Sequence, residues 1–218
     1  PLPRTVHSMG HTTVSTASGR AKHRLYVFGG GSAGDQPVDD EAVYCLDLDS
    51  LMWIQVTAAS DTGPSKRLGH SITTVGSKLF IFGGSCGGDT LGDLWVFDTA
   101  SNTWSSPQTL GPRPPPRTGH TGTALGSKIC FFGGMAFRPT PRVFEDVWVL
   151  DTETLTWHSP ETLVTPSGSP GPRLDHDACA VPRLVSGAEE SDDHDVVLVF
   201  GGMDLSGMHN AAWELAFA

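Results

Sequence analysis

Histidine, cysteine and tyrosine are the side chains of this chain that could bind a metal or carry out redox chemistry. The 218 residues include nine histidines, four cysteines and two tyrosines. Metal sites usually bring such ligands together at short fixed spacings, for example C-x-x-C or H-E-x-x-H. Neither spacing occurs here, and the cysteines are widely separated: Cys45, Cys86, Cys130 and Cys179. We therefore expect no metal, no cofactor and no catalytic residue.

Four of the histidines each follow an arginine by three residues. The pairs are Arg4 and His7, Arg67 and His70, Arg117 and His120, and Arg173 and His176. A pair that returns at regular intervals is better explained by a repeated structure than by catalysis, and we expect it to hydrogen-bond between neighbouring repeats. The first pair has a competitor, because Gly10-His11 matches Gly69-His70; the spacing of Arg4 favours His7.

Up to three further signals follow the Arg-x-x-His pairs in a fixed order, all three in the first three repeats and only the first in the fourth. The first is an apolar run that ends in two glycines: Gly29 and Gly30, Gly83 and Gly84, Gly133 and Gly134, and Gly201 and Gly202. The second is an apolar run that ends in aspartate in three repeats: Asp47, Asp98 and Asp151. The third is a tryptophan six residues later: Trp53, Trp104 and Trp157. The steps from aspartate to aspartate are 51 and 53 residues, a period typical of propeller blades with four strands.

The repeat predicts an all-β chain of four four-stranded antiparallel blades. The glycine pairs allow tight bends at strand ends, and the tryptophans are large enough to fill the space between blades. We expect one propeller segment over 1–218, with blades at about 4–58, 67–108, 117–163 and 173–218. The fourth blade lacks an outer strand, and Ala216 stands where the aspartate is expected.

These motifs resemble the kelch-repeat superfamily, and the resemblance covers nearly the whole chain. It implies a β-propeller that binds a protein partner through its loops. Four blades without a closing strand imply part of a larger ring, with a preceding segment that completes blade four. The alternative is a natural four-blade protein that dimerises. In either case open edges would favour self-association.

The fourth repeat points to one group of proteins within the kelch-repeat superfamily. Arg173-Leu174-Asp175-His176, an acidic insertion and Val199-Phe200-Gly201-Gly202-Met203 are similar to the kelch-motif effectors of the late-endosomal Rab GTPase. That resemblance implies binding to a GTP-bound Rab, a role in vesicle transport, and a cytoplasmic location or peripheral attachment to endosomes. A substrate-recruiting kelch domain of a ubiquitin ligase is the alternative. A copper oxidase like galactose oxidase is disfavoured, because Tyr26 and Tyr44 both occupy apolar strand positions.

The net charge restricts the class of partner, and the composition of the loops indicates where the partner binds. The net charge of −10 disfavours nucleic acid and anionic membranes, and no apolar run is long enough to span a bilayer. Loops after the second and fourth strands emerge on one side of a blade, where we expect the partner to bind. The candidates there are Asp35, Asp39, Asp40, Asp89, Arg138, Arg142 and Asp204. On the opposite side, the insertion Val185–Asp195 offers Ser191 as a phosphorylation site.

Overall fold

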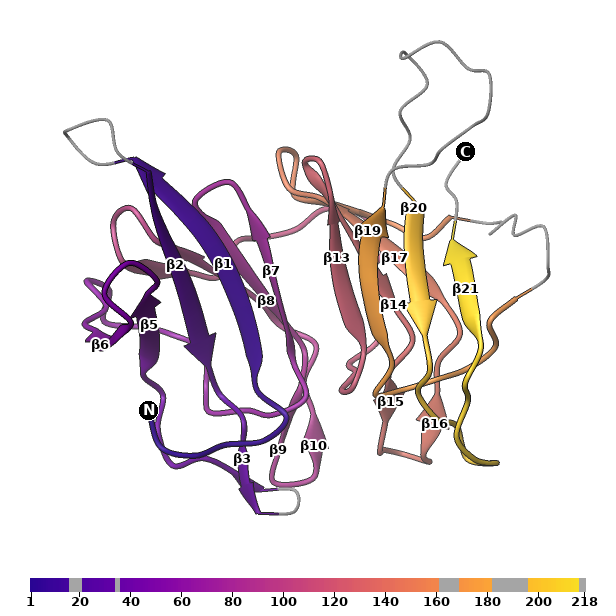
Figure 1. The fold of residues 1–218 in the computed structure, drawn as a ribbon. Helices are drawn as coiled ribbons and strands as arrows, with labels where there is room; N and C mark the ends of the chain where they lie inside the picture. The colour runs from indigo at the N-terminus through magenta and orange to yellow at the C-terminus, as the bar shows by residue number, and fades with distance from the viewer. Residues whose placement is uncertain (16–20, 34–35, 161–168, 182–195, 216–218) are drawn as a thin grey trace, which may run out of the picture. The chain divides into compact units, whose positions relative to one another are not determined.

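The computed structural model of the chain describes residues 1–15, 21–33, 36–160, 169–181 and 196–215 (Figure 1). All of the regular structure in these residues is β-strand, which confirms the all-β class. The main strands form four antiparallel blades, three with four strands and the last with three. The chain divides into two compact units. Unit 1 comprises Pro1–Gln108, Pro115–Thr118 and Ala136–Thr140, and unit 2 comprises Thr109–Pro114, Gly119–Met135 and Pro141–Ala218.

Unit 1 contains the first two blades, in which each strand pairs with the next main strand along the chain. Blade one consists of β1 (Ser8–Ser15), β2 (Ala21–Phe28), β5 (Val43–Asp47) and β6 (Met52–Val56). Blade two consists of β7 (Ser71–Val75), β8 (Lys78–Phe82), β11 (Leu94–Asp98) and β12 (Thr103–Ser105). The second strand of each blade ends at its glycine pair, and the third ends at its repeated aspartate, as the sequence predicts.

Unit 2 contains the third and fourth blades. Blade three consists of β13 (Thr121–Leu125), β14 (Lys128–Phe132), β17 (Val147–Asp151) and β18 (Thr156–His158). Blade four consists of β19 (Asp177–Val181), β20 (Val196–Phe200) and β21 (Ala212–Leu215). Ala216, the expected aspartate position, lies outside the described residues.

Short hairpins follow the glycine pairs of the first three blades, a feature that the sequence did not predict. They are β3 (Gly31–Ala33) with β4 (Gln36–Pro37), β9 (Ser85–Cys86) with β10 (Asp89–Thr90), and β15 (Met135–Ala136) with β16 (Arg142–Val143). A hairpin pairs its own backbone groups, so it can project from the blade without leaving many of them unsatisfied. The hairpins therefore give the loops that follow the second strands a defined shape.

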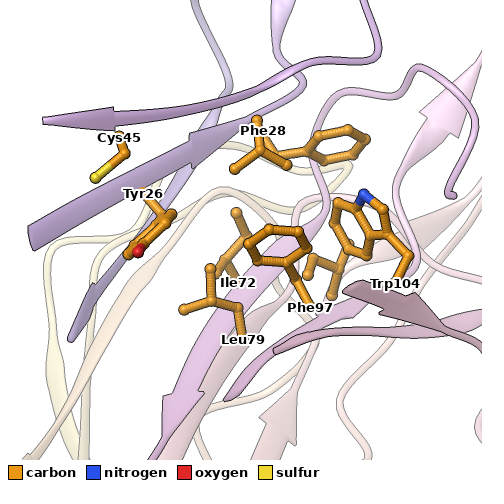
Figure 2. Packing of buried hydrophobic residues seen from close by; sticks show 9 residues of the cluster. Tyr26, Phe28, Cys45, Ile72, Leu79, Phe97 and Trp104 are labelled. Atoms are coloured by element: carbon orange, nitrogen blue, oxygen red, sulfur yellow. The ribbon is translucent and has the colours of Figure 1, made fainter. Parts of the chain in front are cut away.

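The core of unit 1 lies between its two blades (Figure 2). Trp104 of β12 packs against Phe97 of its own blade and against Phe28 of blade one, with ring centroids 4.8 and 5.4 Å away. Tyr26, Ile72 and other apolar side chains extend the cluster. In Figure 2 the tryptophan ring faces the rings of Phe28 and Phe97. Trp104 thus joins neighbouring blades, the role expected of this tryptophan.

Trp53 occupies the same register position in blade one but remains 45% exposed. It pairs with Leu46 on β5 as Trp104 pairs with Phe97 on β11. Among the described residues of unit 1, no aromatic ring packs against Trp53 as Phe28 packs against Trp104. The repeat in the sequence identifies the position but not its burial.

Unit 2 has a separate core between blades three and four. Its buried members come from β14, β17, β20 and β21: Cys130, Phe132, Val147, Val197, Val199 and Leu215. Trp157, the blade-three tryptophan, is 2% exposed and packs at 5.2 Å from Phe131. Both units are therefore stabilised by apolar side chains that two adjacent blades share.

Each position of the glycine pair requires glycine for a different reason. Gly29, the first glycine of blade one, has φ of 63°, and a Cβ there would lie 2.5 Å from the Arg67 carbonyl oxygen of the next blade. Gly84, the second glycine of blade two, has φ of 98°, and a Cβ there would lie 2.9 Å from the Leu68 carbonyl oxygen of its own blade. Both the backbone conformation and the space exclude a larger residue. In unit 1 the first glycine therefore serves the contact between blades, and the second serves the bend within a blade.

The repeated aspartate stabilises the turn between the third and fourth strands. Asp98 Oδ1 accepts hydrogen bonds from the backbone N–H groups of Ala100 and Ser101, at 2.8 and 3.4 Å. Asp151 Oδ1 accepts the equivalent pair from Glu153 and Thr154. Asp47 does the same in blade one. A side-chain acceptor of this kind fixes a tight turn, so these residues are structural.

Candidate functional site

Each repeated arginine is anchored by main-chain carbonyl groups at the end of its blade. Arg4, Arg67 and Arg173 donate from Nη1 to the first glycine of their own pairs, at 2.9, 3.0 and 2.9 Å. Each of the four arginines also donates from Nε to the carbonyl two residues before it. Because Arg4 makes the same contacts, it holds the arginine position of blade one. His11, from the competing Gly10-His11 reading, lies within β1.

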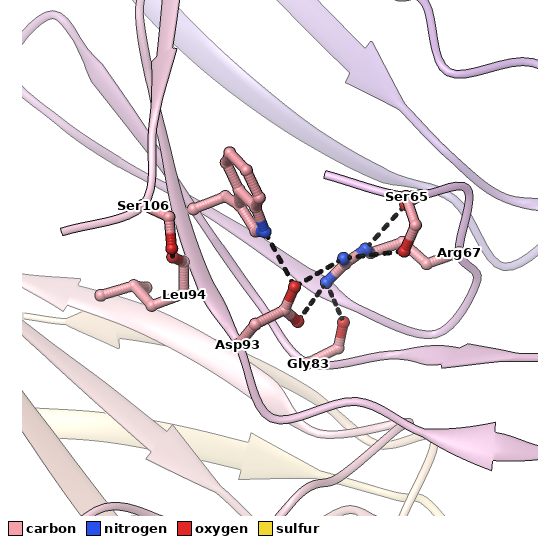
Figure 3. A network of polar contacts seen from close by, with 7 residues as sticks. Ser65, Arg67, Gly83, Asp93, Leu94 and Ser106 are labelled. Atoms are coloured by element: carbon pink, nitrogen blue, oxygen red, sulfur yellow. Dashed lines mark hydrogen bonds and ion pairs between the residues drawn. The ribbon is translucent and has the colours of Figure 1, made fainter. Parts of the chain in front are cut away.

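In blade two a carboxylate completes the arginine site, as Figure 3 shows. The Arg67 side chain is fully buried, and its Nη1 and Nη2 bind the two oxygens of Asp93 at 2.7 and 2.9 Å. The Trp95 indole N–H donates to the same carboxylate at 2.8 Å. Burial alone raises the pKa of Asp93, but the bonds from Arg67 and Trp95 outweigh it and hold that pKa below its usual value. The carboxylate is therefore ionised at neutral pH and neutralises the buried guanidinium.

Blade one builds the same ion pair with a different residue. Arg4 Nη2 binds Asp40 at 3.0 Å, and the Tyr44 hydroxyl donates to the same carboxylate at 3.1 Å. Burial raises the pKa of Asp40, whereas bonds from the Ala42 N–H, Arg4 and Tyr44 lower it further than burial raises it. Asp40 was a candidate for partner binding from its place in a polar loop. Its contacts make it part of the arginine site of blade one.

The contact between blades uses the arginine main chain. In unit 1 the N–H of Gly30 in blade one donates to the Arg67 carbonyl of blade two at 2.9 Å. Gly134 and Arg173 repeat the contact in unit 2 at 2.8 Å. The sequence led us to expect the Arg67 side chain to reach across blades. Instead its guanidinium returns into its own blade, and its backbone makes the contact.

The repeated histidines differ in burial. His70 and His176 are 5% and 7% exposed, whereas His7 is exposed. The His70 ring lies edge-on to Phe28 at 5.6 Å, and His176 packs similarly on Phe132 at 5.2 Å. Burial, with a smaller contribution from the adjacent arginine in each case, lowers the pKa of His70 to about 3 and that of His176 to about 4. Both rings are therefore neutral at neutral pH.

The lowered pKa values of His70 and His176 predict that the stability of the fold depends on pH. Their folded pKa values lie below the value of about 6.5 expected in the unfolded chain. The unfolded chain therefore binds more protons, and stability present above pH 6.5 is lost as the pH falls towards 4. We expect each histidine to cost about 1.4 kcal/mol per pH unit in that window. Urea unfolding at pH 7 and pH 5 measures the loss, and His70→Gln should make it smaller; an unchanged slope in this variant would contradict the assignment.

Two candidate loops of unit 1 carry exposed ion pairs. Asp39 binds Lys66 at 2.6 Å, and Asp89 binds Arg138 at 3.1 Å. The side chains are well exposed: 95% for Asp39, 41% for Lys66, 68% for Asp89 and 75% for Arg138. The structure thus brings Asp89 and Arg138 together from loops that are far apart in the sequence. Lys66 was not among the predicted candidates, because only the folded chain places it beside Asp39.

The remaining candidates lie in unit 2 or outside the described residues. Arg142 stacks over the ring of Phe144 at 5.2 Å. Asp204 accepts hydrogen bonds from Ser206 and Gly207, and its carboxylate lies 3.3 Å from His209. The bonds from Ser206, together with those from its neighbours, lower the pKa of Asp204 to about 2. Asp35 and the insertion at 185–195, including Ser191, are not among the described residues.

Exposed apolar side chains gather on two strands. On β6 they are Met52, Trp53 and Ile54, and on β20 they are Leu198 and Phe200. Of the two, β6 is the edge strand of its sheet, whereas β20 lies between β19 and β21. Self-association through open edges stays a prediction. No helix long and apolar enough to cross a bilayer was found in the described residues.

The described part of the chain shows no group of three or more histidine, cysteine, aspartate or glutamate side chains that could hold a metal ion. The two tyrosines, which a copper oxidase of this fold would use, have structural environments. Tyr26 is 1% exposed within the core of unit 1, and Tyr44 donates to Asp40.

The blades, glycine pairs, tryptophans and arginine sites together define a kelch-type β-propeller. Comparison with family models agrees, since the model of the KLHDC2/KLHL20/DRC7 Kelch-repeats domain matches residues 1–186. The chain belongs to this kelch-repeat family.

Curated relatives include proteins named "Rab9 effector protein with kelch motifs". The chain is 38% identical to the one from Xenopus laevis over 44% of its own length and 24% of the relative. For Gallus gallus it is 44% identical over 44% of the chain and 23% of the relative, and for Homo sapiens 40% identical over 43% and 23%. The matches thus span about a quarter of those relatives. Together with the kelch domain, they support a protein-interaction scaffold.

Proposed function

We propose that the chain acts as the scaffold of a Rab effector, which binds a Rab GTPase of the Rab9 type in its GTP-loaded state. The observation that carries this proposal is the identity of 38–44% to kelch proteins named as Rab9 effectors. The name of those relatives and the match to a kelch-repeat family model favour a binding role. Vesicle transport from late endosomes, in the cytoplasm or on the endosome surface, belongs to the same proposal.

The exposed ion pairs of unit 1 are the surface that we assign to the partner. Blades one and two provide a rigid base, because strand pairing and a shared core fix the ends of the strands from which the loops project. Exposed ion pairs contribute only about 0–1 kcal/mol to stability. The residues of the pairs Asp89–Arg138 and Asp39–Lys66 can therefore separate and bind charged groups of a partner at small cost in free energy. Alternating charge also favours one orientation of the partner.

The test immobilises the chain and measures retention of Rab9 loaded with a non-hydrolysable GTP analogue or with GDP. We expect retention of the GTP form alone. Equal retention of both forms, or of neither, would remove the effector proposal.

Charge reversal then tests the surface. Arg138→Glu should weaken retention about tenfold or more, since it replaces attraction by repulsion. The matched control is Lys78→Glu, an exposed charge reversal at the opposite end of β8 from the β9–β10 hairpin. A larger loss for the control than for Arg138→Glu would place the partner at the other end of the blade.

A further inference from the structure

The arginine site of blade four differs from those of blades one and two. Arg173 is 2% exposed and donates to main-chain carbonyl oxygens of Gly201, Pro170 and Gly171. Among the described residues no carboxylate forms an ion pair with it. Asp204 influences its charge from a greater distance, but the Asp204 carboxylate is already bound to Ser206 and lies next to His209. A guanidinium is thus buried without the counter-charge that Arg4 and Arg67 have.

The missing acid can be located because the backbone of blade four repeats that of blade two. The N–H of Gly201 donates to the carbonyl of Ala211 at 3.3 Å, as the N–H of Gly83 donates to the carbonyl of Asp93 at 3.2 Å. Blade three has the same bond, from Gly133 to Asp146. Ala211 therefore stands at the position from which Asp93 reaches Arg67.

A second donor next to this position has also lost its acceptor. Trp213 pairs with Val199 on β20 as Trp95 pairs with Ile81 on β8, so the two tryptophans are equivalent. The indole N–H donates at 2.8 Å to Asp93 in blade two, and that of Trp148 donates at 2.8 Å to Asp146 in blade three. The Trp213 Nε1 is buried and has no hydrogen-bond partner among the described residues.

These observations define the chemistry of a ligand. A buried cation without a counter-charge and a buried N–H group without an acceptor are both costly, and one carboxylate satisfies both in blade two. Burial lowers the pKa of the Arg173 guanidinium, which reflects the same unfavourable environment. The position is also accessible, because Ala211 is exposed and the equivalent Asp93 side chain is 41% exposed.

We propose that Arg173 and Trp213 form a carboxylate-binding site at the position of Ala211, and that it receives an aspartate or glutamate side chain of a protein partner. A protein is favoured as the source because the loop that leads from Gly202 to Ala211 exposes apolar side chains. Leu205 is 76% exposed and Met208 is 87% exposed. The inference goes beyond the proposed Rab partner, since it assigns a site and its chemistry whichever protein supplies the acid.

The first experiment uses no partner protein, so its outcome is independent of Rab binding. Sodium acetate is titrated against the chain at constant ionic strength with sodium chloride, and the Trp213 indole N–H resonance is followed by ¹H–¹⁵N NMR. We expect a saturable downfield shift, because a charge-assisted hydrogen bond forms. Trp213→Phe assigns the resonance by removing it. An indole signal that responds to acetate no more than to chloride would overturn the site.

Ala211→Asp provides an internal competitor. The introduced carboxylate should bind Arg173 and Trp213, raise Tm by about 2–4 °C and abolish the response to acetate. Ala211→Asn is the control, since it has the same shape without the charge and should leave most of the response. Equal behaviour of the two variants, or a fall in Tm for Ala211→Asp, would contradict a vacant carboxylate position.

Two capped peptides test whether the source is a protein. The peptide Leu-Glu-Leu should bind at least tenfold more tightly than acetate if the exposed loop contributes, and Leu-Gln-Leu should lose most of that affinity. The gain should shrink in the double variant Leu205→Ser/Met208→Ser. Equal affinity for acetate and Leu-Glu-Leu would limit the site to small carboxylates and overturn the assignment to a protein partner.

Discussion

Replacing Trp104 with alanine is expected to lower the free energy of unfolding by about 3–5 kcal/mol. The ring is 8% exposed and contacts Phe28 of blade one as well as Phe97 and Trp95 of blade two. Its removal would leave a cavity between two blades that cannot close without moving whole strands. Urea unfolding followed by far-ultraviolet circular dichroism measures the loss without relying on tryptophan fluorescence.

Trp53→Ala is the matched control for this prediction. The side chain has the same register position and the same chemistry but is 45% exposed. We expect a loss of about 1 kcal/mol, because less apolar area is removed from the interior. Equal losses in the two variants would show that the tryptophan between blades does not hold unit 1 together.

Replacing Arg67 with alanine is expected to cost about 3 kcal/mol. Removal of one partner from a buried ion pair leaves the other without its counter-charge, a change that typically costs 3–5 kcal/mol. The lower end applies because the Asp93 side chain is 41% exposed and water can partly replace the guanidinium. The Gly83 carbonyl oxygen also loses the hydrogen bond from Arg67, and the carboxylate that accepts from the Trp95 indole loses its other donor.

Lys66→Ala is the control for Arg67→Ala. Lys66 is the preceding residue and also binds an aspartate, but both partners of that pair are exposed. Its loss should change the stability by no more than about 1 kcal/mol. Thermal unfolding at low and high salt separates the two cases, since salt should weaken only the exposed pair. Similar effects of both variants would contradict the structural role of Arg67.

The blades could be predicted from the sequence because each strand carries its own local signal. The run before Gly83 and Gly84 is apolar on both faces, which is typical of a buried inner strand, and its end is marked by residues that favour positive φ. Asp98 likewise marks the end of β11 through a turn made with residues two and three positions later. Features that depend only on residues close together in the chain can therefore be predicted from the sequence.

The arginine sites could not be predicted, since their parts are distant in sequence and change position between blades. Asp93 lies 26 residues after Arg67, whereas Asp40 lies 36 residues after Arg4. Asp40 therefore looked like one more acidic loop residue, and Asp93 did not stand out at all. Burial of Trp53 and His7 depends in the same way on whether a neighbouring blade packs on them, which the repeat itself does not encode.

The comparison of blades also shows where function can enter a repeated framework. In blade two the Asp93 carboxylate accepts hydrogen bonds from both the Arg67 guanidinium and the Trp95 indole, so both donors have an acceptor. In blade four Ala211 replaces the acid while Arg173 and Trp213 remain. A repeat that keeps the hydrogen-bond donors of the arginine site but lacks the carboxylate acceptor can bind a ligand that supplies a carboxylate. Fold alone gives no such information, since proteins of one fold differ in their loops and sites.

Amide hydrogen exchange of the chain, with and without Rab9 in each nucleotide state, tests the central claim most directly. The claim is that the two blades of unit 1 bind a GTP-loaded Rab through loops at one end of their strands. We predict slower exchange in the β3–β4 or β9–β10 hairpins, only with the GTP form, and unchanged exchange in the central strands. Protection in neither state, equal protection in both states, or protection confined to the opposite turns at 76–77 and 126–127 would contradict the claim.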